Sequence, residues 1–288
     1  MFTKLSNSWE LVKESAKVLQ ADKELLIFPI VSAIGTIIVS ATFVIPLFLA
    51  NMFDSFFAGK AQILGLIMLF LFYLAQYLVI FFANTALVGA AMIRLRGGDP
   101  TLSDGFRIAF SHFWAIFGYA LISATVGMAL KAIERRSNSL GRLIVSLVGV
   151  AWNIATFLVV PVLAVEDVGP IEAIKRSVSL LKKTWGEQLI GNLGLGAVFG
   201  LVYFGVILSG IAVCIFVAIV IQSVALTVMV ALVFIFIMVI LGLINSALSG
   251  IYTAAVYQFA VEGKSGGFFD ESLIRNTFQN RSSTFSHI

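Results

Sequence analysis

Few side chains in this 288-residue sequence could carry out chemistry, and they are scattered along it. Glu166 and Asp167 are adjacent, so their carboxylates could bind a cation, although a helix-end turn facing water is the simpler interpretation. Histidine occurs only at His112 and His287, which assemble no metal cluster. Cys214 is the single cysteine, so it forms no internal disulfide.

Sequence motifs of known catalytic sites are absent. The sequence has no phosphate-binding glycine loop, no G-x-S-x-G and no H-E-x-x-H. No long apolar run carries an ionisable residue near its middle, where a proton relay or a coupled-ion site usually needs one. We therefore expect a protein that is not an enzyme and has no cofactor, no metal site and no nucleic-acid partner.

The polar side chains inside the apolar runs are amides. In hydrocarbon such groups favour hydrogen bonds between helices, and the alternative is that they line a polar cavity. These residues are Gln76, Asn84, Asn153, Asn192, Gln222, Asn245 and Gln258.

The composition indicates a membrane protein. Hydrophobic residues make up 60% of the chain and charged residues only 12%, whereas soluble domains carry about 25% charged residues. The runs long enough to cross a bilayer are Leu25–Ala50, Ile63–Ile93, Trp114–Leu130 and Leu143–Val165, with a charged loop predicted at Lys131–Arg142. Leu189–Ala260 is uncharged and far too long for one crossing. A break near Gln222 would divide it into two spans, and three shorter spans are the alternative.

Amphipathic segments precede three of these runs and share one spacing of apolar residues, i, i+4, i+7 and i+11. The segments are Ser6–Gln20 (with Leu5, Trp9, Val12 and Ala16), the stretch with Leu102, Phe106, Ala109 and Phe113, and Pro170–Trp185 (with Ile174, Val178, Leu181 and Trp185). We expect helices that lie in the membrane interface, with lipid contacts from Trp9, Phe106, Lys175, Lys182, Lys183 and Trp185. A solvated elbow that only joins two spans is the simpler alternative for Pro170–Trp185.

The predicted fold is all-α, a polytopic helical bundle of about six spans with interfacial amphipathic helices. It consists of three helix-hairpin units, at about 5–93, 102–165 and 170–261, within a single membrane domain at 1–262. Residues 263–288 form a polar tail. Small residues at i+4 spacing, Gly196 with Gly200 and Gly242 with Ser246, Gly250 and Ala254, predict helix contacts within the chain or between subunits of a homo-oligomer.

Lysine and arginine counts select the orientation. With six spans, the two termini and the even-numbered loops hold 14 of these residues, and the odd-numbered loops hold 5. The positive-inside rule therefore places both termini and the tail in the cytoplasm, where the basic helices would meet anionic lipid.

Three segments resemble a family of uncharacterised prokaryotic six-span membrane proteins: S-W-x-L at Ser8–Leu11, the stretch Pro161–Ser177, and A-V-Y-Q-F-A at 255–260. The sharpest piece is E-D-x-G-P-x-x-A-x-x-x-S, which begins at Glu166 and ends at Ser177. That family is distantly similar to the membrane domain attached to some glycerophosphodiester phosphodiesterases. The resemblance implies a six-span fold in the cytoplasmic membrane and supplies no catalytic residue.

The function expected from these observations is that of a non-enzymatic scaffold or interaction protein that can self-associate. The alternative is a channel or transporter for a small solute, with the amides lining its path.

Cysteine labelling checks the topology once Cys214 is replaced. A cysteine at Ser137 should react from outside the cell, and cysteines at Ser103, Ser179 and Ser272 only after permeabilisation. Labelling of Ser272 from outside would instead show that the segment after Leu189 crosses three times.

Overall fold

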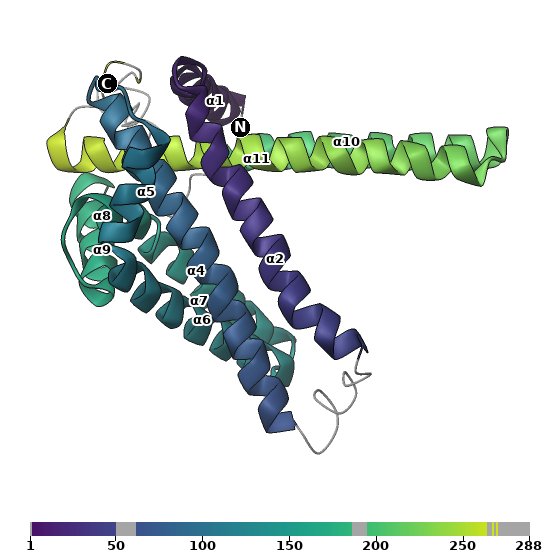
Figure 1. Cartoon of the computed structure of the whole chain (residues 1–288), viewed down its shortest axis with the longest axis horizontal. Coiled ribbons are helices and arrows are strands. Elements are labelled where there is room, and N and C mark those ends of the chain that lie inside the picture. The colour runs from purple at the N-terminus through teal and green to yellow at the C-terminus, as the bar shows by residue number, and fades with distance from the viewer. Residues whose placement is uncertain (1, 50–61, 186–194, 264–266, 268, 270–288) are drawn as a thin grey trace, which may run out of the picture.

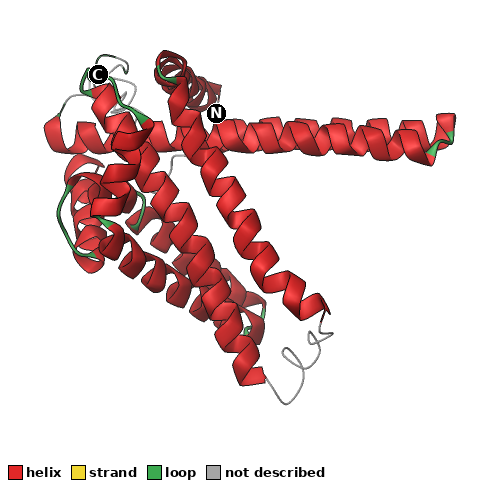
Figure 2. Cartoon of the chain, in the orientation of Figure 1, coloured by secondary structure: helices red, strands yellow, loops and turns green. Residues whose placement is uncertain are grey.

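The computed structural model describes residues 2–49, 62–185, 195–263, 267 and 269. These residues form helices and no strand, as Figure 2 shows. Six of the helical segments are long and apolar enough to cross a membrane, so within the described chain the predicted all-α polytopic fold is confirmed. The sixth begins at Val224 and ends at Glu262, which supports two crossings after Leu189 rather than three.

The first hairpin contains α2 (Ile27–Leu49) and α4 (Gln62–Leu95), which pack against each other. It is preceded by α1 (Phe2–Ala21) and a 3-10 turn, η1 (Lys23–Leu26). Pro29 lies in the first turn of α2, where its missing N–H leaves no bond unmade. The link between the two spans, at 50–61, lies outside the described residues.

The second hairpin follows α5 (Leu102–Ser111) and begins with α6 (Phe113–Arg136). The prediction of a charged loop at Lys131–Arg142 is wrong, because α6 continues through Arg136 and the next helix starts at Ser139. Lys131 remains helical and donates a 2.7 Å hydrogen bond to the Tyr73 hydroxyl of α4. Asn138 accepts from the Gly141 N–H and caps the next helix. Charge marks the end of the apolar part of this span, while capping marks the end of the helix.

The fourth predicted span, Leu143–Val165, is interrupted rather than continuous. α7 (Ser139–Ala155) ends before a turn at 156–158, and α8 (Val159–Val165) follows. Pro161 explains the break, because it has no N–H to bond the Phe157 carbonyl and its ring would collide with that group. The N–H of Leu158, left without a helical partner, donates to the hydroxyl of Ser177 on α9 (Pro170–Trp185) at 3.1 Å.

The third hairpin pairs α10 (Leu195–Phe216) with α11 (Val224–Glu262). A short π-helix, η3 (Val217–Ile221), ends α10, and Gln222 adopts a left-handed conformation with a φ of 53°. Ser223 then accepts from the Leu226 N–H and starts α11. The break predicted near Gln222 is confirmed.

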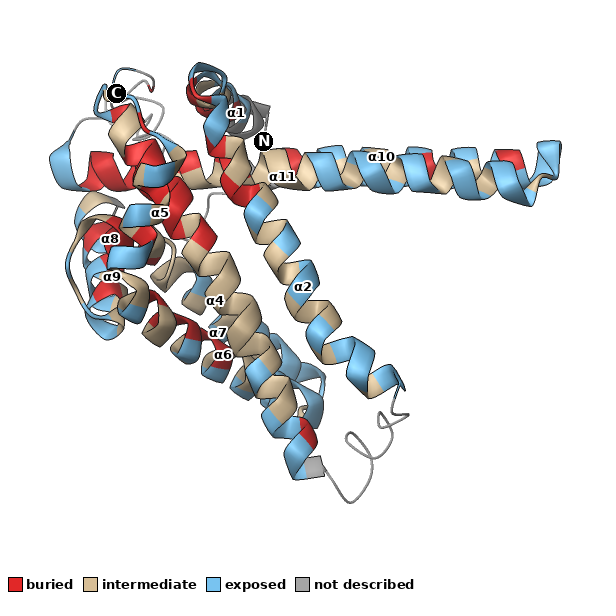
Figure 3. Ribbon diagram, in the orientation of Figure 1, coloured by how far each residue is buried: buried red, intermediate tan, exposed pale blue. Residues whose placement is uncertain are grey.

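The buried core lies at one end of the molecule, where α1, α5, α8 and α9 gather around the ends of α4 and α11 (Figure 3). We call it the core end. From it, the α2–α4 and α6–α7 pairs run in one general direction, and the α10–α11 pair runs in another and projects beyond them (Figure 1). The three predicted hairpins are therefore held together at one end.

The buried faces of the amphipathic helices α1 and α9 overlap the predicted apolar stripes only in part. On α9, Leu181 of the predicted apolar stripe is buried together with Ala173, Ser177 and Leu180, whereas Ile174 and Val178 of the stripe are only half-buried. On α1, Val12 of the predicted stripe is buried together with Leu11, Ser15 and Val18, while Trp9 of the stripe is 47% exposed. On α9 the small residues Ala173 and Ser177 allow the helix backbone to approach its neighbours closely, so the first two turns of this helix bury residues next to the large apolar ones.

Replacement of Ser177 tests its role at the helix break. Ser177→Ala leaves the buried N–H of Leu158 without a partner, which should lower the free energy of unfolding by about 1–3 kcal/mol. Ser179→Ala, an exposed position on the same helix, is the matched control and should have little effect. Thermal unfolding in detergent measures both, and equal melting temperatures for the two variants would contradict the assignment.

Candidate functional site: polar contacts at the core end

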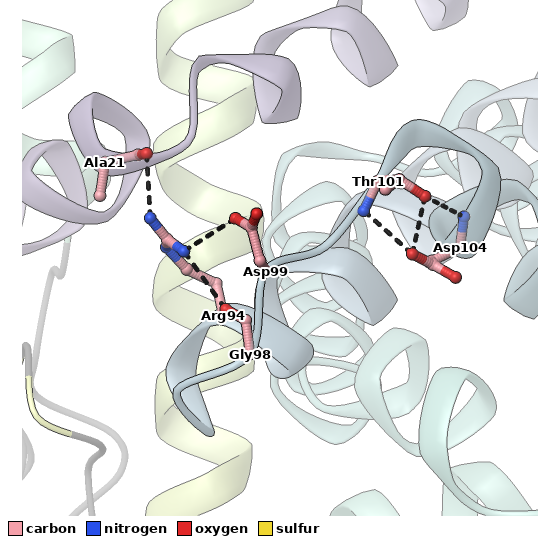
Figure 4. A network of polar contacts seen from close by, with 6 residues as sticks. All are labelled: Ala21, Arg94, Gly98, Asp99, Thr101 and Asp104. Atoms are coloured by element: carbon pink, nitrogen blue, oxygen red, sulfur yellow. Dashed lines mark hydrogen bonds and ion pairs between the residues drawn. The ribbon is translucent and has the colours of Figure 1, made fainter.

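Arg94, at the end of α4, joins the first hairpin to the helix that precedes it. Its Nη2 donates to the carbonyl of Ala21 at 3.0 Å, and its Nη1 donates to the Gly98 carbonyl and to the Asp99 carboxylate at 3.2 and 3.1 Å (Figure 4). The chain turns back after α4 at Gly97, whose φ of 85° is a conformation that glycine adopts more readily than other residues. The guanidinium thus fixes the loop after α4 against the end of α1.

Arg96 links the end of α4 to the end of α11. Its Nε and Nη2 donate to Oε1 of Glu262 at 3.2 and 2.7 Å, and Oε2 of the same carboxylate accepts from Gln258 at 3.2 Å. The Arg96 side chain is 48% exposed, so this pair contributes little to stability while fixing the relative position of the two helix ends.

Glu166 makes the corresponding link for the second hairpin. Its carboxylate accepts from Nε of Arg176 on α9 at 2.9 and 3.1 Å, and from the Tyr257 hydroxyl of α11 at 2.9 Å. Pro170 lies close against Gly118 of α6, where a Cβ would be only 2.8 Å from the proline ring. The acidic residue that the sequence singled out is a structural acceptor between three helices.

Two carboxyl groups at the core end have shifted pKa values. Burial raises the pKa of Asp22, and the nearby Arg94 offsets this rise only in part. The Oδ2 atom of Asp22 has no hydrogen-bond partner in the described part of the chain. Hydrogen bonds from the Thr101 hydroxyl and N–H lower the pKa of Asp104 (Figure 4). The Asp104 side chain thereby completes a capping box at the start of α5. Only Asp22 is therefore held in a setting that disfavours its charge.

These contacts can hold helices together, but they offer no metal site. No group of three or more histidine, cysteine, aspartate or glutamate side chains converges anywhere in the described residues. Each arginine of this region is paired with an acidic residue, which is the pattern of structural ion pairs.

The predicted lipid-contact residues are not brought together. The ring of Phe106 packs against Phe28 at 5.2 Å between centroids, so it contacts protein as well as any lipid. Lys13 lies over the Trp9 ring at 5.9 Å. Lys175, Lys182 and Lys183 are exposed on α9, and the side chain of Trp185 lies outside the described residues. Contact of any of these residues with lipid stays a prediction.

The amides occupy separate helix pairs instead of one path. Gln76 donates to the Ser40 hydroxyl at 2.8 Å and to the Thr36 carbonyl at 3.2 Å, which joins α4 to α2. The Asn245 side chain lies near the Tyr203 hydroxyl, between α11 and α10.

The remaining amides differ in their surroundings. Asn84 is half-buried and Asn153 is exposed, and neither side chain has a hydrogen bond in the described part of the chain. Asn192 falls outside that part. Gln222 forms the turn before α11, and Gln258 contacts Glu262 near its end.

Sequence reasoning missed Arg94, Arg96, Glu262, Arg176 and Tyr257. One signal was available, because Glu262 is the first charged residue after the long uncharged stretch and the arginines follow the second predicted span directly. Opposite charges at the same end of neighbouring spans are candidates for pairing.

Comparison with known families gives one match. Residues 63–268 match the model of a family of unknown function, DUF6159. The matched region begins at α4 and contains all of the later helices, and it leaves out α1 and α2. No curated protein and no solved structure matches the chain.

Replacement of Asp22 tests whether its buried carboxylate destabilises the fold. Because the pKa of Asp22 is raised in the folded state, the protonated carboxyl group stabilises the fold at a pH below its unfolded-state pKa of 3.8. This stabilisation is lost as the pH rises through the folded-state pKa. Asp22→Asn should therefore raise the melting temperature at pH 7, by a few degrees at most, and the gain should vanish below pH 3.8.

The control is Asp99→Asn, which removes a 94% exposed carboxylate from the same arginine. It should change the melting temperature little at either pH. Thermal unfolding in detergent across this pH range measures both variants. A lower melting temperature of Asp22→Asn at pH 7 would show instead that the attraction between Asp22 and Arg94 dominates.

Proposed function

The chain belongs to the DUF6159 family of unknown function, and from that premise we propose that it is a non-enzymatic scaffold or interaction protein. It uses its last hairpin, α10–α11, to contact other transmembrane helices within the bilayer. The structure is that of a multi-pass membrane protein, and the arrangement of this hairpin is the observation that carries the proposal.

The α10–α11 hairpin projects beyond the rest of the bundle (Figure 1). Phe204 on α10 is 61% exposed and Phe236 on α11 is 65% exposed, whereas the C-terminal part of α11 is buried in the core. The described residues of the projecting part carry no charge. A long apolar hairpin held only at its base presents most of its surface to the membrane, where lipid or another helix can cover it.

A groove between the two helices supports a helix as the partner. It has a volume of about 550 Å³ and an almost entirely apolar lining, which includes Gly210, Ile211, Cys214 and Met238. Gly210 lets the two helices of the hairpin approach, since a Cβ there would be 2.9 Å from the ring of Phe234. Close approach at small residues is the usual basis of helix association in membranes.

The partner that we propose is a second copy of the chain, which gives a homo-oligomer. An identical hairpin has the same apolar composition, and a symmetric contact uses one surface twice. The small-residue stripe predicted on α11 is used within the chain at Gly250, which packs tightly against Leu87 of α4, whereas a Cβ at Gly200 on α10 would meet no atom within 4 Å. The exposed part of α10–α11 therefore remains as the surface for association.

We further propose the cytoplasmic membrane as the location, with both termini in the cytoplasm. The excess of lysine and arginine at the core end supports this orientation. Lys175, Lys182 and Lys183 are exposed there and would contact anionic lipid. The distant similarity to the membrane domain of glycerophosphodiester phosphodiesterases also remains a proposal, and no activity follows from it.

Transport of a small solute is the second candidate, and the placement of the amides argues against it. Gln76 and Asn245 each lie between a different pair of helices. Neither the groove between α10 and α11 nor the pocket at the end of α4 is lined by an amide side chain.

Single-molecule photobleaching in liposomes tests the self-association. The wild-type protein should form dimers or larger assemblies as the protein-to-lipid ratio rises. Ile211→Trp, which fills the groove at a 53% exposed position, should weaken association by about tenfold, equivalent to about 1.4 kcal/mol.

The matched control is Ile37→Trp, at a 67% exposed position on α2 outside the groove, and it should associate like the wild type. Wild-type protein that stays monomeric at every density would contradict the proposed partner. Turnover of a lipid or soluble substrate by the purified protein would contradict the non-enzymatic role.

A further inference from the structure

A pocket of about 420 Å³ opens at the core end, between the last turns of α4, α5 and the end of α8. This volume is within the range of about 300–1,000 Å³ typical of small-molecule sites. Its lining is apolar at Met92, Ile108 and Val165, and Arg96 is the one charged side chain that contributes to it. The pocket therefore combines several apolar side chains with a single cationic one.

The order of these residues along α4 gives the pocket a direction. Gly89 and Met92 lie within the apolar part of the helix, and Arg96 lies just past its end, where the chain leaves the hydrocarbon. Gly89 and Arg96 are seven positions apart along the chain, which corresponds to a rise of about 10 Å along the helix axis. A phospholipid has the same order along the membrane normal, with its acyl chains below its phosphate.

Arg96 can bind a further anion without losing its present partner. Its pair with Glu262 uses Nε and Nη2, and Nη1 has no hydrogen bond in the described part of the chain. A guanidinium offers five N–H donors and binds phosphate oxygens in a planar geometry. The 48% exposure of this side chain leaves it within reach of a lipid headgroup.

We propose that this pocket binds one membrane phospholipid, with an acyl chain against Met92, Ile108 and Val165 and its phosphate on Arg96. The charge of the arginine selects the phosphate, and the apolar lining selects the chain. The site is separate from the α10–α11 groove, so it stands or falls independently of the proposed self-association.

Native mass spectrometry of the purified full chain, titrated with dioleoylphosphatidylglycerol, tests the proposal. The wild type should bind one lipid saturably, and Arg96→Gln should bind it about tenfold more weakly, because it loses a charge-assisted contact with phosphate. Val165→Phe, which fills part of the pocket at a half-buried position, should also weaken binding. Dioleoylglycerol, which lacks the phosphate, should bind the wild type and Arg96→Gln equally weakly.

Three controls separate this site from general effects. Arg107→Gln removes an exposed arginine that also pairs with an acidic residue at the core end, and Ala151→Phe adds a ring at an exposed position of α7. Both should bind the lipid like the wild type. Glu262→Gln breaks the same ion pair as Arg96→Gln while keeping the arginine, so it should bind the lipid as tightly as the wild type or more tightly.

Two results would overturn the proposal. Equal loss of binding in Arg96→Gln and Glu262→Gln would show that the ion pair acts through structure alone. Equal affinities of Arg96→Gln and Arg107→Gln would show that the lipid binds elsewhere or through non-specific charge.

Discussion

The requirement to satisfy every backbone N–H and C=O inside hydrocarbon governs this structure. Continuous helices meet it automatically, so each place where a helix stops must be completed by other groups. At the turn before α8, the hydroxyl of Ser177 accepts a hydrogen bond from the N–H of Leu158. At the turn before α11, the Ser223 hydroxyl caps the new helix after the left-handed Gln222. The hydroxyl of Ser177 thus completes the break within the fourth span, and the hydroxyl of Ser223 caps the helix that begins the sixth.

The same requirement explains why the polar contacts gather at the core end. Charged groups are expensive within hydrocarbon, so the arginines and carboxylates that join the hairpins lie where the helices leave it. Arg96 meets Glu262 there, and Glu166 meets both Arg176 and Tyr257. Beyond this end, Gln76 joins the two helices of the first hairpin and Lys131 joins α6 to α4, while the third hairpin diverges from the others. The helices are therefore held together at the core end, and the α10–α11 hairpin projects away from it.

The sequence predicted the spans because hydropathy depends only on local composition. It did not predict the break near Pro161, although proline within a helical pattern is a direct signal of one. The predicted stripes identified Val12 and Leu181 as buried but missed Ala173 and Ser177, because close helix packing favours small residues that a search for large apolar ones passes over. The pairing of Arg96 with Glu262 joins residues far apart in the chain, and no local pattern specifies which charges meet. The lipid contacts and the self-association stay predictions.

The stretch from Glu166 to Ser177 gives the clearest case of a motif whose pattern has a structural explanation. Glu166 accepts bonds from two helices, Pro170 fits against Gly118, and Ala173 and Ser177 form the buried face of α9. Packing or hydrogen bonding thus explains these four residues of the motif, whereas nothing in the structure explains Gly169, where a Cβ would meet no atom within 4 Å. Function in this chain is better sought on surfaces that the packing leaves uncommitted. Those surfaces are the exposed arm of α10–α11 and the pocket beside Arg96, where an apolar lining and an accessible guanidinium remain after the fold has satisfied its own contacts.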